Sequence, residues 1–320
     1  PQMTGSAADY VIQVRANDVT NGFRLSASLA SPHSGHRAQH FTRDSGNTEE
    51  HSANALALAS LVGSEISNVE NERAAATRSA GSHQLVAACR SSLSGFSSKH
   101  FARGLEYMKM ALTIDPEYPL LLSSLGRAHA LAWRFGWSDP SIDHLETARG
   151  FADRAVRLAP NDPRCQADLG FVRFWCNEPL ESAWHYERSL DALPFHPELA
   201  ADAGMVFSYV ERNEEAASVL ERSIANLPSD ADYRLWSLGD VYYAKRDYAN
   251  SLKWLLRMSD QSQAQRLLAA NKARLGLDPS RHVAKVLEMQ PDFSVRHWVA
   301  IQPFTNDGDR IDYQEALLLA

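Results

Sequence analysis

Amphipathic stretches with a helical period recur along most of this chain, and each of them ends at a proline. Proline has no backbone N–H and stops a helix at its position. Pro160, Pro194 and Pro228 are equally spaced, and Pro116 precedes them by a longer interval. A recurrence of about 34 residues, as between these three, predicts a repeat protein built from pairs of helices. The five prolines are Pro116, Pro160, Pro194, Pro228 and Pro291.

Glycines recur in the same repeats, at regular intervals before the prolines. Gly170 precedes Pro194 by the same interval as Gly204 precedes Pro228, and Gly239 continues the series one repeat after Gly204. The interval from Gly126 to Pro160 is longer than these two by ten. This excess predicts an insertion over residues 133–142, between the two helices of one repeat. Its three aromatic residues form either a structural plug between the helices or an exposed contact patch: Trp133, Phe135 and Trp137.

The glycine and small-residue pattern resembles the tetratricopeptide repeat (TPR) family, which has Leu-Gly in the first helix, small residues in the second and proline after it. The matching pairs are Leu125-Gly126, Leu169-Gly170, Ala203-Gly204 and Leu238-Gly239. The small positions of the second helices are Ala148, Ala155, Ser182, Ser189, Ala216 and Ser223. The resemblance covers residues 82–291, and it departs from the pattern at Gln263, where proline is expected, and at Ser92, where glycine is expected.

We therefore predict a mainly α protein, a TPR-type α-solenoid of five to six helix pairs over residues 82–291. Residues 292–320 are expected to form capping helices, the last of them over residues 309–319. Terminal repeats are commonly atypical because they close the stack.

The segment over residues 1–75 has a different pattern. Residues 10–15 and 23–29 alternate apolar with polar or small side chains at a period of two, which predicts strands. Asn21-Gly22 stands directly before the second of them and predicts a hairpin. A third strand is expected over residues 36–43, and a helix with Thr48 as its cap over residues 48–72. A partial α/β unit over residues 1–75 is expected to precede the solenoid.

This segment resembles the carboxyl half of a TolB-like α/β domain. The resemblance depends on Asp9-Tyr10-Val11-Ile12, Ser34-Gly35 and Phe41, and it departs from the pattern at Gln13-Val14 and near His40. The two parts in this order resemble the region after the catalytic domain of bacterial class III adenylate cyclase-like proteins, or after the winged-helix domain of related transcription regulators. The tail, with Phe293 to Trp298 and Pro303-Phe304, favours the cyclase version. The resemblance implies that an active domain of the parent protein lies upstream of residue 1.

Composition narrows the classes of function. The formal net charge is −7, which argues against binding nucleic acid through a basic face. No apolar run approaches the roughly 18 residues that a membrane span needs, and no signal peptide is evident, so we expect a cytoplasmic protein. Three cysteines without a C-x-x-C spacing predict neither a disulfide framework nor a zinc site.

No motif for nucleotide, phosphate or metal-protease chemistry occurs, and no nucleophile motif either. We therefore predict no catalysis, no cofactor and no metal. The densest histidine group is His33, His36 and His40, but no cysteine or carboxylate nearby would complete a metal site.

The first helix of each TPR lines the concave face, so counting from the Leu-Gly mark gives the inward positions. They carry many large aromatic rings, which concentrate binding energy at interfaces. Either these rings bind a peptide or protein partner, or they fill the inside of the superhelix and receive the chain's own tail. The positions are Arg127, Phe171, Phe174, Trp175, Met205, Tyr209, Tyr233, Trp236, Asp240 and Tyr243.

Overall fold

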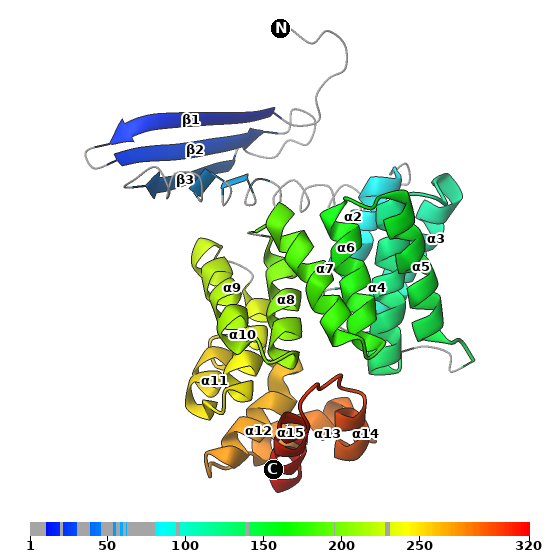
Figure 1. The fold of residues 1–320 in the computed structure, drawn as a ribbon, viewed down its shortest axis with the longest axis vertical. Helices are drawn as coiled ribbons and strands as arrows, with labels where there is room; N and C mark the ends of the chain where they lie inside the picture. Colours follow the sequence, from blue (N-terminus) through cyan, green and yellow to red (C-terminus); the bar gives the residue numbers. More distant parts are fainter. Residues whose placement is uncertain are drawn as a thin grey trace, which may run out of the picture. The chain divides into compact units, whose positions relative to one another are not determined.

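The computed structural model describes residues 11–19, 22–30, 39–45, 54–55, 58–59, 62, 81–93, 97–137, 141–194, 196–227 and 231–320. The chain divides into two compact units, Pro1–Val69 and Glu70–Ala320. We call them the N-terminal unit and the C-terminal unit and describe each by itself (Figure 1).

The N-terminal unit contains a three-stranded antiparallel sheet in the order β1-β2-β3, which confirms the predicted strands. The strands are β1 (Val11–Val19), β2 (Gly22–Ala30) and β3 (Gln39–Ser45). The β1–β2 ladder begins at the pair Val19 and Gly22, as the predicted hairpin requires. Residues 54–55, 58–59 and 62 are helical, within the predicted helix, and the rest of that helix lies outside the described residues.

Alternation along β2 builds the core of this unit. Leu25, Ala27 and Leu29 are buried and form one cluster with Leu58 and Val62 of the helical turns. Because strand side chains alternate between faces, every second residue of β2 points at these turns. The unit is thus a sheet with helical turns packed on one face, a partial α/β unit.

The C-terminal unit is a TPR-type solenoid of helix pairs, as predicted. Within its described residues, six consecutive pairs run from α2 to α13, and the two helices of each pair contact each other. The first helices of successive pairs, α2, α4, α6, α8 and α10, also contact one another in order. Figure 1 shows the pairs following one another from cyan to orange. The first four pairs are α2 (Ser82–Leu93) with α3 (Ser98–Ile114), α4 (Pro119–Phe135) with α5 (His144–Leu158), α6 (Pro163–Trp175) with α7 (Pro179–Ala192), and α8 (Pro197–Tyr209) with α9 (Asn213–Asn226).

The last two pairs and the tail complete this unit. They are α10 (Asp232–Ala244) with α11 (Tyr248–Leu255) and α12 (Gln265–Arg274) with α13 (Ser280–Met289), followed by α14 (Val295–Ala300) and α15 (Asp307–Leu319). A short 3₁₀ turn, Ser262–Ala264, precedes α12. The final helix α15 packs against α12 and α14.

The prolines end the second helices as the sequence predicts. Helices α3, α5, α7, α9 and α13 each end two residues before their proline. The intervening cap residue has a φ between −133° and −146° in all five helices. A residue before proline is pushed out of the α region. The helix therefore stops one residue earlier than the proline alone requires.

The ten-residue insertion is placed differently from our prediction. The first three of its residues extend α4 by a turn, so Trp133 and Phe135 belong to that helix and not to a connecting loop. The helix ends only at Gly136, whose φ of 63° is the left-handed conformation that favours glycine. No helix-breaking residue occurs before this glycine, which explains the longer helix.

Gly126 lets α4 approach α5 closely. A Cβ atom at this position would lie 2.9 Å from the carbonyl oxygen of Ala148 and 3.1 Å from the Cβ atom of Ala152. The obstruction is partly backbone, which cannot rotate away as a side chain can. The small second-helix positions of this repeat are fully buried for the same reason: Ala148, Ala152 and Ala155.

We expect Gly126→Ala to destabilise the protein by about 1–2 kcal/mol, since overpacking outweighs the better helix propensity of alanine. Gly150→Ala is the matched control, because Gly150 lies on α5 with no atom within 4 Å of the added methyl group. This control should gain about 0.5–1 kcal/mol. Urea denaturation followed by circular dichroism measures both changes, and a Gly126→Ala protein as stable as the control contradicts the close approach.

Candidate partner-binding face

The inward positions lie on the inner helices, by which we mean α4, α6, α8 and α10, the first helices of their pairs. Six of the ten side chains are buried: Arg127, Phe171, Phe174, Trp175, Met205 and Tyr243. The other four are partly exposed: Tyr209, Tyr233, Trp236 and Asp240. Burial of the first group means that these side chains shape the face, while the second group keeps part of its surface accessible to solvent.

An ion network, which the sequence analysis did not anticipate, crosses the inner helices. Arg127 of α4 donates to the Asp202 carboxylate of α8 at 2.7 and 3.2 Å. Arg90 of α2 donates to Asp168 of α6 at 2.7 Å and to Glu198 of α8 at 2.9 Å. The network thus links four successive pairs of the solenoid. It consists of two arginines and three carboxylates, and each of these charges has an oppositely charged partner in the interior, where an unpaired charge is costly.

Electrostatics within this network follow from burial and proximity. Burial by itself would raise the pKa of the Glu198 carboxyl, but Arg90 and Arg127 hold it well below its usual range. The hydroxyl of Tyr233 on α10 donates to Asp202, which extends the network to a fifth pair. Glu198 remains about one-third exposed, with 33% of its side-chain surface accessible, and so keeps a carboxylate at the surface of the inner helices.

The sequence contains a sign of this network, an aspartate that recurs at one position of the repeat. Asp168 and Asp202 occupy the same repeat position, two residues before Gly170 and Gly204. Both are buried, with side-chain exposures of 0% and 1%. Two acidic residues at one inward-facing repeat position require buried cations, so a search for arginines on the preceding first helices would have found Arg90 and Arg127.

The chain's own C-terminal segment contacts the inner helices. The ring of Phe304 stacks on Tyr209 with centroids 4.8 Å apart and an interplanar angle of 20°. The Thr305 hydroxyl donates to the backbone carbonyl of Tyr209. Tyr313 of α15 packs edge-on against Tyr243 of α10 at 5.5 Å. One of the two alternatives from the sequence, a face that receives the tail, is therefore seen at these two tyrosines.

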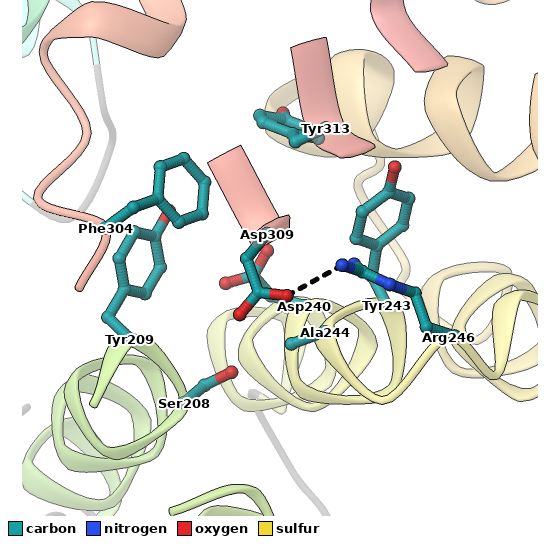
Figure 2. A pocket seen from close by; sticks show the side chains of 9 residues that line it. All are labelled: Ser208, Tyr209, Asp240, Tyr243, Ala244, Arg246, Phe304, Asp309 and Tyr313. Atoms are coloured by element: carbon teal, nitrogen blue, oxygen red, sulfur yellow. Dashed lines mark hydrogen bonds and ion pairs between the residues drawn. The ribbon is translucent and has the colours of Figure 1, made fainter. Parts of the chain in front are cut away.

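A small cavity remains between α8, α10 and the tail (Figure 2). Its volume of about 20 Å³ is room for one water and not for a ligand. Burial raises the pKa of the Asp240 carboxyl to about 7, with Arg134 opposing and Asp309 adding to the rise. Asp309 itself is held by Arg246 at 2.8 Å. The cavity is lined by Ser208, Tyr209, Asp240, Tyr243, Ala244, Arg246, Phe304, Asp309 and Tyr313.

The aromatic residues of the insertion pack against the solenoid. Phe135 stacks on Trp137 with centroids 4.5 Å apart, and Trp137 reaches Phe101 of α3 at 6.0 Å. Trp133 lies 6.4 Å from Trp175 of α6. All three rings of the insertion are partly buried against the core. Their packing favours the structural plug over an exposed contact patch.

Metal ligands are not gathered in the described part of the chain, where no group of three or more His, Cys, Asp or Glu residues could hold an ion. Of the histidines considered from the sequence, His40 lies on β3, while His33 and His36 lie outside the described residues.

His129 and His144 have their Nδ1 atoms 2.9 Å apart. Burial, helped by His144, lowers the pKa of His129 to about 4, so this ring is neutral near pH 7.

Among the described residues, none of the helices has both the length and the apolar character that a membrane crossing requires.

Comparison with protein-family models finds no matching family. A search of curated proteins finds no match in sequence either.

Several solved structures are similar to this chain. The type IV pilus biogenesis factor PilW is 14% identical, with a TM-score of 0.47, over 67% of this chain and 95% of its own. A thermophilic TPR protein of Thermus thermophilus is 14% identical, with a TM-score of 0.43, over 74% and 100%. Pseudomonas aeruginosa PilF is 12% identical, with a TM-score of 0.43, over 73% and 97%. The repeat fold of this chain is established by its own helix pairs.

Proposed function

We propose that this chain is a non-catalytic scaffold whose inner helices bind a peptide or a protein segment. The observation that carries the proposal is the chain's own tail, in which residues 302–305 lie against α8. Tyr209 there meets a stacked ring, a hydroxyl donor and the side chain of Gln302, whose Oε1 atom lies 3.4 Å from the tyrosine hydroxyl. A surface that binds a non-helical segment of its own chain has the aromatic and polar groups that a foreign segment needs.

We assign one part of this face to a partner, the part around Trp236 and Tyr233 of α10. Their rings are nearly parallel, with centroids 6.1 Å apart and an angle of 25°, and both are partly exposed. The hydrogen bond from the Tyr233 hydroxyl to buried Asp202 fixes the Tyr233 ring before any partner binds. Preorganised aromatic side chains lose little freedom on binding, which favours affinity. Glu198 adds an exposed carboxylate to the same set of helices.

The proposal includes a setting, the interaction region of a cytoplasmic bacterial signalling protein. Its support is the sequence resemblance to the region that follows a cyclase or winged-helix domain. In the alternative version, the chain is the C-terminal portion of an adenylate or guanylate cyclase-like enzyme or of a transcription regulator. Sequencing the gene upstream of the codon for residue 1 tests this setting. A cyclase or winged-helix domain encoded there supports it, and an unrelated reading frame contradicts it.

We expect the wild-type protein, immobilised on an affinity column, to retain a partner protein. The immobilised Trp236→Ala variant should not retain this partner. Trp184→Ala is the matched control, because Trp184 is a 49% exposed tryptophan on a second helix, α7. Mass spectrometry of the bound proteins gives the readout. Partners retained by the wild type and by Trp184→Ala but lost with Trp236→Ala support the inner face. Equal retention by all three proteins, or no specific retention by the wild type, contradicts the proposal.

A further inference from the structure

Two arginines near the inner face have no carboxylate partner. Arg134 lies in the last turn of α4 and Arg266 in the first turn of α12. Among the described residues, no Asp or Glu oxygen lies within 4 Å of either guanidinium, whereas Arg90 and Arg127 have two or more such partners each. The Nε atom of Arg134 is buried without any hydrogen-bond acceptor. A buried guanidinium donor left unpaired costs free energy, so an acceptor that reached Arg134 would be stabilising.

Both arginines make cation–π contacts with the same aromatic ring. The Cζ atom of Arg266 lies 4.0 Å from the centroid of Trp298, and the Cζ atom of Arg134 lies 5.7 Å from it. Arg134 also covers Trp175 of α6 at 4.3 Å. A cation–π contact holds a guanidinium in place without using its N–H donors, which stay free to meet an anion.

The neighbouring indole supports the same conclusion. The Nε1 atom of Trp175 is buried and has no hydrogen-bond partner. Arg134 and Trp175, in contact with each other, thus both present donors without acceptors. A group that satisfied them would have to be an acceptor, and an anion satisfies arginine best.

The charge balance of this interior is positive. Burial lowers the pKa of Arg134, and burial together with Arg134 lowers the pKa of Arg266 to about 10, so the protein disfavours both cations as they stand. Asp240 acts on Arg134 from α10, and burial raises the pKa of that carboxyl to about 7, which leaves it partly protonated near neutral pH. The phenol groups of Tyr209, Tyr233 and Tyr313 act on Arg134 as well, and each of them raises its pKa. Two arginines against at most one carboxylate give this interior an excess of at least one positive charge. One monoanionic group would reduce that excess.

We propose that Arg134 and Arg266, which both contact Trp298, bind a carboxylate of an acidic peptide segment. This inference rests on the proposed function and names the chemistry of its partner. Both residues keep some exposed surface, and we take this surface as the point where the peptide approaches. A singly charged carboxylate matches the excess charge, while a phosphate dianion would exceed it and meet Asp240.

The test uses two capped hexapeptides with a fluorescent label, one alternating leucine with glutamate and the other leucine with glutamine. Fluorescence anisotropy measures their binding to the wild type, Arg134→Met and Arg266→Met. Arg103→Met on α3 is the matched control, since Arg103 is an exposed arginine away from the inner helices. We expect the glutamate peptide to bind the wild type and the control equally, and each inner variant about tenfold more weakly. The glutamine peptide should bind all four proteins equally and more weakly.

Several outcomes overturn the inference. Equal binding of the glutamate peptide to the wild type and both inner variants removes the site. A glutamine peptide that binds as tightly as the glutamate peptide removes the anion but leaves a peptide-binding face, so the proposed function survives. If neither peptide binds the wild type, the inference fails, and the Trp236→Ala capture experiment decides the proposed function separately. Phosphate that displaces the glutamate peptide at lower concentration than acetate assigns the site to phosphate instead.

A folding defect is separated from a binding defect by a charge-conserving variant. Arg134→Lys keeps the cation but loses the planar, stacked donor set. We expect it to be as helical as the wild type and to recover part of the affinity that Arg134→Met loses. Full loss of peptide binding in Arg134→Lys together with unchanged helicity contradicts a charge-dependent site.

Discussion

The Asp202→Ala variant is expected to be about 3–5 kcal/mol less stable than the wild type. Asp202 is 1% exposed and accepts two hydrogen bonds from Arg127 and one from Tyr233. Removing its carboxylate leaves the Arg127 guanidinium, itself only 7% exposed, with Glu198 at 3.4 Å and Asp168 at 3.8 Å as its remaining ion-pair partners. The loss should therefore come mainly from the buried guanidinium and phenol donors that lose their acceptor.

Urea denaturation monitored by circular dichroism gives this change, and a double-mutant cycle identifies its origin. Arg127→Met in the Asp202→Ala background should recover part of the lost stability, because the guanidinium donors that lost their acceptor are then absent. Glu106→Ala is the surface control, since its ion pair with Lys109 joins two side chains that are each 69% exposed. That control should change stability by less than about 0.5 kcal/mol. An Asp202→Ala protein as stable as the control contradicts a structural role for the network.

The helix pairs were predictable because their determinants are local. A proline stops a helix where it stands, and a glycine or alanine at a fixed repeat position permits one helix to approach the next. Both effects act within about one repeat, so the sequence interval alone carries them. The same locality explains the correction at the insertion, where the sequence interval indicated ten extra residues but not the helical conformation of the first three. Gly136, and not the start of the extra segment, ends that helix.

The ion network and the tail contacts were not predictable in the same way. Arg127 and Asp202 are 75 residues apart, and Arg90 and Glu198 are 108 apart. Such pairs form only when successive first helices are stacked with a particular curvature, which no single repeat encodes. Tyr209 meets Thr305 across 96 residues for the same reason. The sequence offered two alternatives for the inner rings, and the packing of the tail could not be deduced from their positions.

The N-terminal unit shows a further limit of periodicity. Alternation along β2 correctly indicated its buried face, because Leu25, Ala27 and Leu29 all pack on the helical turns. On β1 the same alternation does not mark burial, since Ile12 and Val14 are 48% and 65% exposed. Strand β1 is at one end of the described sheet order, and an apolar residue there has strand neighbours on one side only. A period of two predicts a strand, whereas burial depends on what covers it.

The ten inward residues illustrate how structure divides a set that the sequence treats as uniform. Phe174 and Trp175 meet edge to face at 4.9 Å, and Phe174 meets Tyr209 at 5.1 Å. These rings form a continuous packed layer between α6 and α8. Trp236, by contrast, is only partly buried and has Tyr233 as its ring neighbour. The two tryptophans should therefore respond differently to the same substitution.

Trp175→Ala is expected to cost about 3–5 kcal/mol of stability, the usual range for removing a buried large aromatic side chain. Trp175 is 3% exposed and packs against Phe171, Phe174 and the Arg134 guanidinium. Because each repeat is stabilised by its neighbours, the loss should also loosen α4 and α8. Trp236→Ala should cost much less and keep the solenoid folded, since that ring already contacts solvent. Thermal and urea unfolding of both variants, with hydrogen exchange to locate the loosened helices, measure the difference. A large loss in both variants would show that Trp236 also fills the core, and it would defeat the partner-binding face.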